Sequence, residues 1–361
     1  MKILFCLGSL NRGGAERVVS NLANYFIKYN EVSIVITSPD LPQYELDKNI
    51  IVYHLDKKRE SNNIIYKNLK RIYKLNKIVR KDKPDIIISF LPEPSYRVLL
   101  LKKIRKIPVI VSVRNDPNVE YKSKINNLVM KILYPLADGF VFQTEDAKNY
   151  FNKKIQSKSV IIPNSIKETF IQRDIYTGEK DKIIVNIGRL EKQKNQELLI
   201  EAFNDIKDEF LNYNLYIYGE GTLKENLKNK IKEMDLENRV FLKGEVENIE
   251  EKIEKSSVFV LSSKYEGMPN ALMEAMALGV PCISTDCPCG GPKFLIQNGV
   301  NGILAKVDKK EEIVQGIRKI LSDENFANDI SKNAIKIREK LNPKVINFKW
   351  KNYIEKIIKE N

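Results

Sequence analysis

Two basic residues flank a short loop that could bind an anion. Arg189 and Lys194 lie within Gly188–Asn195, between an apolar run and an expected helix that Asn195 would N-cap. A guanidinium contacts phosphate with two parallel hydrogen bonds, and an ammonium supplies a point charge. The spacing therefore indicates phosphate binding, and a solvated basic loop is the alternative interpretation.

Two carboxylates are spaced for binding hydroxyl groups. Glu266 and Glu274 belong to the stretch 266–279, in which Asn270 opens an expected helix and Gly279 ends it. Carboxylates accept hydrogen bonds from hydroxyls, so one could bind a sugar and the other a ribose. The alternative is a surface glutamate followed by a glutamate that stabilises the helix dipole.

Two expected helix N-termini could also hold an anion. The backbone N–H groups of Ala271 and Leu272 are one such set, and the loop containing Gly13 and Gly14 precedes the other. The glycines of this first loop do not follow GxGxxG, so a dinucleotide fingerprint is unsupported. A tight glycine turn is the alternative there.

Metal binding and histidine-based hydrolysis are poorly supported. Cys282, Cys287 and Cys289 lie close together but lack a fourth ligand, and the only histidine, His54, is in the other half of the chain. A single histidine ending an expected strand also disfavours Ser–His and Cys–His hydrolase schemes. We therefore expect no metal.

The first part of the chain is basic. Residues 1–150 carry a net charge of +11 and residues 201–300 carry −6, within a total of +14. An amphipathic helical stretch contributes most, and it indicates a solvated face, an anionic membrane surface or nucleic acid. We expect the membrane or acceptor contacts to come from Lys67, Lys70, Arg71, Lys74, Lys77, Arg80 and Lys81.

Strand and helix patterns alternate through both halves of the 361 residues, which predicts two α/β domains with parallel sheets. The expected division is a domain at 1–165, a linker at 166–181, a domain at 182–340, and a helix at 341–361 that returns to the first domain. No run reaches the roughly 20 apolar residues of a membrane span. The few cysteines fit a reducing cytoplasm. Strands are expected at 2–7, 33–37, 50–55, 85–89, 109–113 and 139–143, then at 182–188, 214–218, 257–262 and 281–284.

These loops, in this order, resemble the retaining glycosyltransferases of family 4 over nearly the whole chain. The most specific stretches are GRLEKQKN at 188–195 and EGMPNALMEAMALG at 266–279, supported by GGAERV at 13–18. The resemblance implies the GT-B fold, with two Rossmann-like domains whose parallel sheets face a central cleft. It also implies that the second domain binds the donor nucleotide-sugar.

The resemblance implies a role for each matched residue. Arg189 and Lys194 would hold the donor diphosphate, Glu266 would contact the sugar, and Glu274 would bind the ribose. Many relatives carry histidine where this chain has Arg114, which could stabilise a phosphate but could not act as a neutral base. The remaining donor-binding residues implied are Gly13, Gly14, Lys243, Gly244, Asn270, Ala271 and Leu272.

The function expected is transfer of a hexose or N-acetylhexosamine from a UDP-sugar, without metal or cofactor. The expected acceptor is a glycan on a polyprenyl-diphosphate lipid, at the inner face of the cell membrane, in cell-surface polysaccharide or glycan biosynthesis. A nucleotide-sugar epimerase or sugar phosphorylase of the same fold is the nearest alternative. A non-catalytic basic protein that binds nucleic acid is the alternative from another class.

Overall fold

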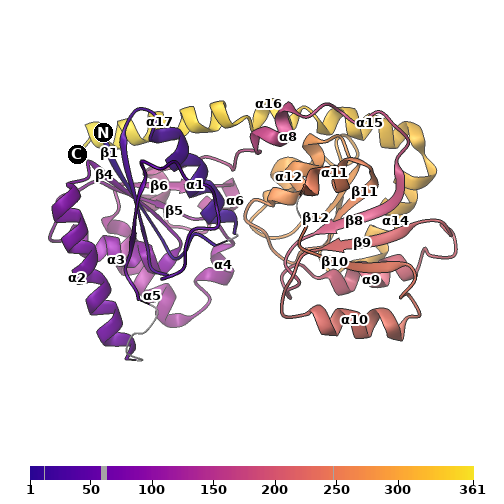
Figure 1. Ribbon diagram of the computed structural model, residues 1–361, viewed down its shortest axis with the longest axis horizontal. Helices are drawn as coiled ribbons and strands as arrows, with labels where there is room; N and C mark the ends of the chain where they lie inside the picture. Colours follow the sequence, from indigo (N-terminus) through magenta and orange to yellow (C-terminus); the bar gives the residue numbers. More distant parts are fainter. Residues whose placement is uncertain (12, 58–62, 247) are drawn as a thin grey trace. The chain divides into compact units, whose positions relative to one another are not determined.

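The computed structural model describes residues 1–11, 13–57, 63–246 and 248–361 (Figure 1). The chain forms two compact units. Unit 1 comprises Met1–Asn164 and Lys344–Asn361, and unit 2 comprises Ser165–Pro343. Within the described residues, no helix is long and apolar enough to cross a membrane.

Unit 1 is built on a seven-stranded parallel sheet in the order β3-β2-β1-β4-β5-β6-β7. Its central strands are almost wholly buried, as expected for a parallel sheet covered on both faces. The strands are β1 (Lys2–Leu7), β2 (Glu31–Ile36), β3 (Ile51–His54), β4 (Ile86–Phe90), β5 (Val109–Ser112), β6 (Gly139–Phe142) and β7 (Ser159–Ile161).

Helices cover both faces of this sheet, with α1 and α17 on one face and α2, α3 and α5 on the other (Figure 1). This division follows from right-handed crossovers, because the strand order turns back at β1. The helices are α1 (Gly14–Phe26), α2 (Ile64–Asp82), α3 (Pro92–Lys102), α4 (Pro117–Glu120), α5 (Lys124–Leu133), η1 (Tyr134–Leu136), α6 (Glu145–Asn149), α7 (Lys153–Ser157) and α17 (Pro343–Lys359).

Unit 2 has a six-stranded parallel sheet in the order β10-β9-β8-β11-β12-β13. The strands are β8 (Asp181–Ile187), β9 (Asn214–Tyr218), β10 (Val240–Gly244), β11 (Ser256–Leu261), β12 (Cys282–Thr285) and β13 (Ile303–Ala305). The helices are α8 (Glu168–Gln172), α9 (Gln196–Asn204), α10 (Lys224–Glu233), α11 (Ile249–Glu254), α12 (Asn270–Ala277), α13 (Gly291–Leu295), α14 (Lys310–Ser322), α15 (Glu324–Ala334) and α16 (Ile337–Lys340).

The segment expected as a linker, 166–181, is structured in unit 2. It contains α8, whose Phe170 is buried, and Arg338 donates hydrogen bonds to the carbonyls of Ile171 and Arg173. The many charges of this segment hid two apolar residues from the sequence pattern, Ile166 and Phe170, which are both buried. Unit 2 ends with α15 and α16, which are separated by a short break.

The C-terminal helix α17 packs within unit 1. Its Trp350 is fully buried and stacks on Phe90, with ring centroids 6.1 Å apart. The Tyr353 hydroxyl accepts a hydrogen bond from the Phe140 N–H at 3.0 Å and donates one to the Lys158 carbonyl at 2.6 Å. The last helix therefore belongs to the first fold unit, although Tyr353 is 213 residues from Phe140 and 195 residues from Lys158 in the sequence.

Candidate functional site

The loop that follows β8 is fixed by backbone contacts with the loop that follows β9. Leu190 N–H donates to the Glu220 carbonyl at 2.9 Å. Gly219 has φ +135°, and a Cβ there would lie 2.1 Å from the Gly188 carbonyl oxygen, so only glycine permits this approach. Arg189 is exposed on this loop.

Lys194 forms a largely buried ion pair with Glu266. Lys194 Nζ lies 2.5 Å from Glu266 Oε1, and the side chains are 17% and 7% exposed. Glu266 Oε1 also accepts from Ser263 Oγ at 2.7 Å, and Oε2 lies 3.5 Å from Gln193 Nε2. The structure thus brings a cation predicted to bind phosphate against a carboxylate predicted to bind sugar.

Three further hydrogen bonds join the loops that carry this pair. Lys264 N–H donates to the Gln193 carbonyl at 2.8 Å, and Gln193 Nε2 donates to the Tyr265 carbonyl at 3.0 Å. Ser262 Oγ donates to the Lys194 carbonyl at 2.9 Å. Gln193 and Ser263 were not among the predicted site residues, although Gln193 lies within the stretch 188–195 that carries the family resemblance.

Asn195 stands at the N-cap position of α9, as expected, but it does not cap the helix with its side chain. Its backbone is left-handed, with φ 52°, and its Nδ2 donates instead to Asp308 Oδ1 at 3.0 Å. Asn195 therefore ties the loop to the chain beyond β13.

Helix α12 begins at Asn270 and ends at Ala277, and Gly279 follows with φ +69°. Leu272 is fully buried and Glu274 is 7% exposed, whereas Asn270 and Ala271 are partly exposed. Glu274, which is predicted to bind the ribose, is therefore held within the fold of unit 2. Its role, and those of the helix N–H groups, stay predictions.

The base-contacting region expected at Lys243 and Gly244 lies at the end of β10. Lys243 Nζ is 4.2 Å from the centroid of the Tyr216 ring, and Gly244 has φ +68°. Gly219 N–H donates to the Gly244 carbonyl at 2.8 Å, so β9 and β10 end together. Gly244 thus shares the carboxyl edge of the sheet with the loop of Arg189.

In unit 1, α1 begins at Gly14, and Gly13 precedes it in an extended conformation. The Tyr44 hydroxyl accepts from Gly13 N–H at 3.2 Å and donates to the Gly13 carbonyl at 2.8 Å. A Cβ on Gly13 would lie 2.2 Å from Glu16 Oε2. The neighbouring Arg12 lies outside the described residues, and donor binding at the two glycines stays a prediction.

Arg114, at the end of β5, is buried among aromatic rings. Its guanidinium carbon lies 5.4 Å from the Phe90 ring centroid and 5.3 Å from the Trp350 ring. Nε donates to Ser112 Oγ at 2.7 Å and Nη1 to Asn164 Oδ1 at 3.1 Å. Burial lowers the pKa of Arg114 to about 9. The side chain is thus held inside unit 1, and its expected role at a phosphate stays a prediction.

Residues 12–170 match the family described as Glycosyltransferase Family 4, and residues 167–337 match Glycosyl transferases group 1. The chain belongs to glycosyltransferase family 4. A relative from Methanocaldococcus jannaschii, named only as a glycosyltransferase, is 34% identical over 88% of this chain and 87% of its own.

Two Campylobacter jejuni relatives of this glycosyltransferase carry more specific names. One is 30% identical over 92% of each chain, and its name gives an alpha-1,4-N-acetyl-D-galactosaminyltransferase and a PP-undecaprenol-linked saccharide. The other is 32% identical over 93% of this chain and 94% of its own, and is named a 4-alpha-N-acetylgalactosaminyltransferase with a diphospho-undecaprenol saccharide.

Solved structures confirm the GT-B fold of the glycosyltransferase. The Anabaena protein HepE, solved with UDP, has a TM-score of 0.83 at 18% identity and covers 99% of this chain and 100% of its own. Sucrose-phosphate synthase from Thermosynechococcus elongatus has a TM-score of 0.84 at 17% identity, covering 100% of both chains.

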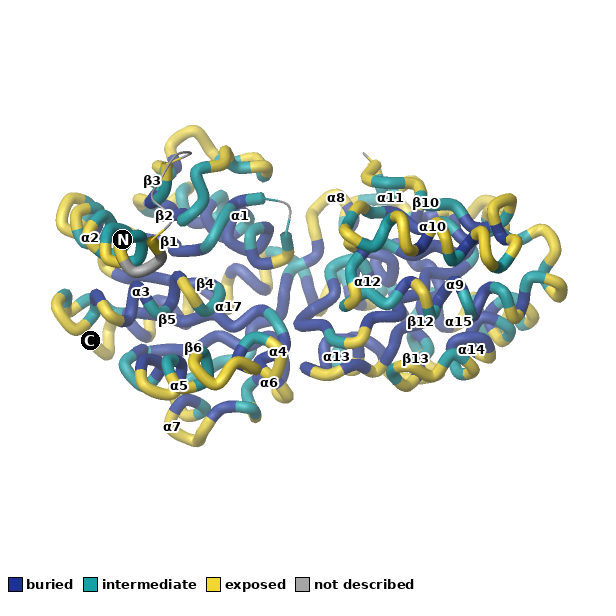
Figure 2. The backbone as a smooth tube through the Cα atoms, turned by 90° about the horizontal axis from the view of Figure 1, so that it is seen from below, coloured by how far each residue is buried: buried dark blue, intermediate teal, exposed yellow. Residues whose placement is uncertain are grey.

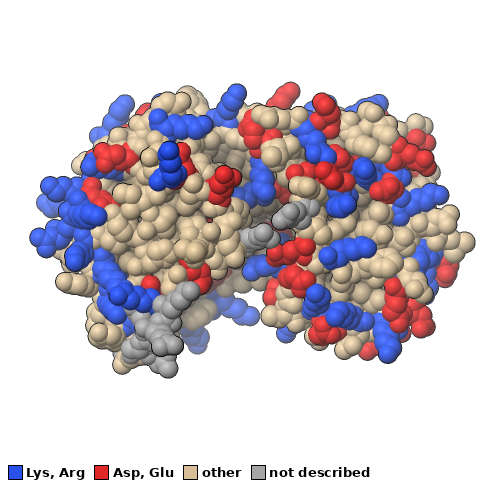
Figure 3. Space-filling view, viewed as in Figure 1, with Lys and Arg blue, Asp and Glu red and all other residues tan. Residues whose placement is uncertain are grey.

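The cations of α2 divide into two groups. Arg71 and Lys74 bind within the fold, to the Asp56 carboxylate and the Leu55 carbonyl respectively. The exposed members are Lys77, Arg80 and Lys81, while Lys67 and Lys70 are partly exposed. Figure 3 shows Lys and Arg gathered along the α2 edge of unit 1. Membrane or acceptor binding by these residues stays a prediction.

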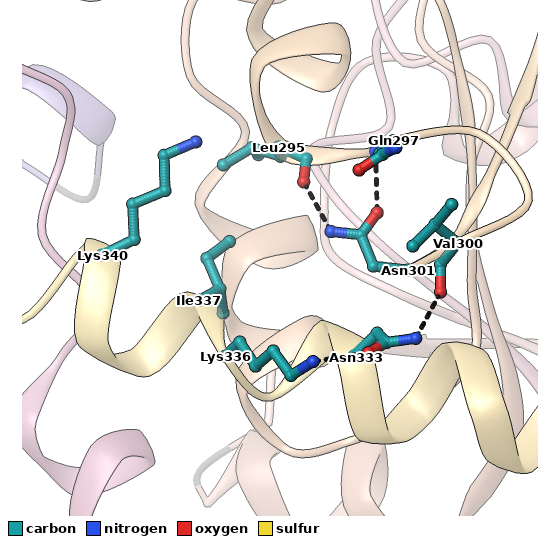
Figure 4. Close-up of a pocket in the computed structure, with 8 residues that line it drawn as sticks. All are labelled: Leu295, Gln297, Val300, Asn301, Asn333, Lys336, Ile337 and Lys340. Carbon is teal, nitrogen blue, oxygen red and sulfur yellow. Dashed lines mark hydrogen bonds between the residues drawn. The ribbon is translucent and has the colours of Figure 1, made fainter.

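Unit 2 of the glycosyltransferase has a pocket of about 260 Å³, whose polar side chains form hydrogen bonds within the fold (Figure 4). Asn301 Nδ2 donates to the Leu295 carbonyl at 3.1 Å, and Asn333 Nδ2 donates to the Val300 carbonyl at 3.1 Å. The first bond joins the turn before β13 to α13, and the second joins this turn to α15. None of the predicted site residues lines this pocket.

His54 and the cysteines occupy structural positions. His54 ends β3, with Nδ1 2.9 Å from the Ser38 carbonyl oxygen. Cys282, Cys287 and Cys289 are buried free thiols. Across the part of the chain that is described, no three His, Cys, Asp or Glu side chains form a group that could hold a metal ion. Metal independence stays a prediction.

Proposed function

We propose that this glycosyltransferase moves a hexose or N-acetylhexosamine from a UDP-sugar to a lipid-linked glycan, in polysaccharide or lipid-linked glycan biosynthesis. The ion pair between Lys194 and Glu266 carries the proposal. It holds a cation and a sugar-binding carboxylate together on two loops at the carboxyl edge of a parallel sheet, where such folds bind ligands.

The donor part of the proposal assigns one task to each charged residue. Arg189 and Lys194 stabilise the negative charge that grows on the departing diphosphate, so that no metal is required. Glu266 accepts hydrogen bonds from the sugar, and Glu274 accepts them from the ribose. The departing phosphate takes the acceptor proton, the acceptor attacks from the leaving-group side, and anomeric configuration is retained.

Support for a UDP donor and a lipid-linked acceptor comes from relatives. A structural neighbour was solved with UDP, and two relatives have undecaprenol-linked saccharides in their names. A lipid-linked acceptor would bring the enzyme to the inner face of the cell membrane as a peripheral protein, and the exposed cations of α2 suit an anionic surface.

The first test is thermal unfolding with UDP, GDP, ADP and a panel of UDP-hexoses and UDP-N-acetylhexosamines. A ligand at 100 times its Kd stabilises by about 2.7 kcal/mol. We expect a shift with UDP and one UDP-sugar, lost in Arg189→Ala and kept in the control Lys192→Ala, an exposed cation of the same loop. No shift with any nucleotide would contradict the proposal.

Product analysis separates the alternatives. A transferase consumes UDP-sugar only with an acceptor or slowly with water, whereas an epimerase converts it to another UDP-sugar without acceptor. A nucleic-acid-binding protein would bind RNA or DNA with steep salt dependence and turn over no sugar nucleotide.

A further inference from the structure

Helix α5 presents an apolar stripe to solvent. Ile125, Leu128 and Ile132 are 76%, 59% and 58% exposed. Their spacing places them on one face of the helix. We call these three residues the α5 stripe. Three large aliphatic side chains on one outward helix face indicate a surface that meets something less polar than water.

The inner face of α5 is fixed to unit 1. Met130 and Leu133 are buried, and Asn127 Nδ2 donates to the Tyr150 hydroxyl at 3.1 Å. The stripe therefore cannot turn inward without breaking these contacts. Its exposure is a fixed property of the folded unit.

The segment that carries the α5 stripe is basic, and no acidic residue lies between Tyr121 and Leu133. Lys122, Lys124 and Lys131 are exposed. With Tyr121, Asn127 and Leu128 they line a shallow groove of about 330 Å³. Aliphatic residues flanked by lysines match the boundary between acyl chains and anionic headgroups of a bilayer.

Helix α2, in the same layer of helices as α5, also has large apolar or aromatic side chains exposed to solvent. Helix α3 packs against both α2 and α5 in unit 1, and exposed residues recur along α2 and α5 (Figure 2). On α2, Tyr66, Leu69 and Tyr73 are each more than half exposed. Tyrosine suits the membrane interface because its ring is apolar and its hydroxyl stays wet.

We propose that α5 docks unit 1 on an anionic bilayer, with the α5 stripe entering the boundary between headgroups and acyl chains. The lysines beside the stripe and the exposed cations of α2 bind the lipid phosphates. Helices of this kind enter the boundary by roughly 5–10 Å. The docking rests on the proposed function, since a lipid-linked acceptor requires an enzyme held at the bilayer surface.

The first experiment measures flotation of the full chain with vesicles of phosphatidylcholine alone or with phosphatidylglycerol. We expect binding only to the anionic vesicles. The triple variant Ile125→Ser, Leu128→Ser, Ile132→Ser should bind at least tenfold more weakly. The matched control is Leu211→Ser, which removes a 69% exposed leucine from unit 2 and should change nothing. Equal binding by wild type and the triple variant would overturn the proposal.

The second experiment measures insertion directly. In Leu128→Trp, the new indole should be quenched by lipids brominated on their acyl chains, whereas Leu211→Trp should not be. The native Trp350 is fully buried and supplies a constant background. Absence of quenching in Leu128→Trp would overturn insertion. So would self-association in water that the triple variant abolishes, because the stripe would then join two copies of the chain.

Melting with UDP separates this inference from the proposed function. The triple variant should keep the full UDP shift, which also shows that it folds. If the wild type did not bind vesicles but kept its UDP-induced melting shift, only the docking inference would be contradicted. Vesicle binding without any nucleotide shift would contradict the donor assignment alone.

Discussion

The ammonium of Lys194 lies 2.5 Å from the carboxylate of Glu266, a residue on the loop that follows a different strand. Ser263 Oγ donates to the same carboxylate oxygen at 2.7 Å. Because the pair is largely buried, each charge offsets the other. A phosphate entering the site would compete with Glu266 for the ammonium and free the carboxylate to accept from a sugar hydroxyl.

Lys194→Ala should lower kcat/KM for the UDP-sugar by roughly 10²–10³-fold, the range seen when one donor to a developing charge is lost. It should also reduce the melting temperature without nucleotide, because Glu266 keeps a buried charge. The control is Lys264→Ala, which removes a more exposed ion pair with Asp308. A change in kcat/KM of less than threefold in Lys194→Ala would refute the assignment.

Glu274→Gln tests the ribose contact. Wild type should bind UDP at least tenfold more tightly than 2′,3′-dideoxy-UDP, because the carboxylate accepts from both hydroxyls. In the variant this preference should shrink, since an amide accepts less strongly and only through its oxygen. Calorimetric titration of both nucleotides measures the ratio, and an unchanged ratio would remove Glu274 from the ribose site.

Arg114→Ala should destabilise unit 1 by about 2–3 kcal/mol, from lost hydrogen bonds and cation–π contacts. Since Trp350 is the only tryptophan and lies against Arg114, its emission spectrum should shift. Arg114→Lys should recover part of the stability, as it keeps the charge but not the planar fork. The surface variant Arg318→Ala serves as control. An unchanged melting temperature and an unchanged emission spectrum in Arg114→Ala would show that the contacts of Arg114 contribute nothing to the stability of unit 1.

Glu120 should make unit 1 less stable as the pH rises. Burial, with a smaller contribution from Asp116, raises the pKa of Glu120 from 4.5 to about 7. The folded state therefore binds more protons than the unfolded state between these values, and this stability is present below pH 4.5 and lost as the pH rises through 7. In Glu120→Gln, the fall in melting temperature from pH 5 to pH 8 should be smaller by a few degrees, as about 1 kcal/mol shifts Tm by roughly 2–4 °C. An identical pH profile would contradict the assignment.

Removal of divalent cations should leave transfer unchanged. Arg189 and Lys194 supply fixed positive charge to the leaving group, so activity in excess EDTA should equal activity with Mg²⁺ once the enzyme has been dialysed against chelator. Restoration of a lost activity by Mg²⁺ would show that the cations alone are insufficient.

Local sequence patterns predicted most strands of the fold. The strands at 2–7 and 214–218 were predictable because buried parallel strands are short apolar runs. Such runs can be recognised in the sequence without knowing which strands pair with them. Three strands were not predicted, namely β7, β10 and β13. Strands β7 and β13 have three residues each, which is too few to show a periodicity. Ile166 and Phe170 show the same limit, because these two buried side chains lie in a segment that its composition marked as a linker.

The sequence by itself determined which residue types follow which strands, and so placed Arg189, Lys194 and Glu266 at the carboxyl edge of one parallel sheet. Only the tertiary structure decided that Lys194 and Glu266 touch, because their loops meet through sheet pairing between distant strands. It likewise decided that Arg114 is enclosed by Trp350 from the last helix. Contacts between residues far apart in the sequence depend on how the elements pack, so the spacing of neighbouring residues does not predict them.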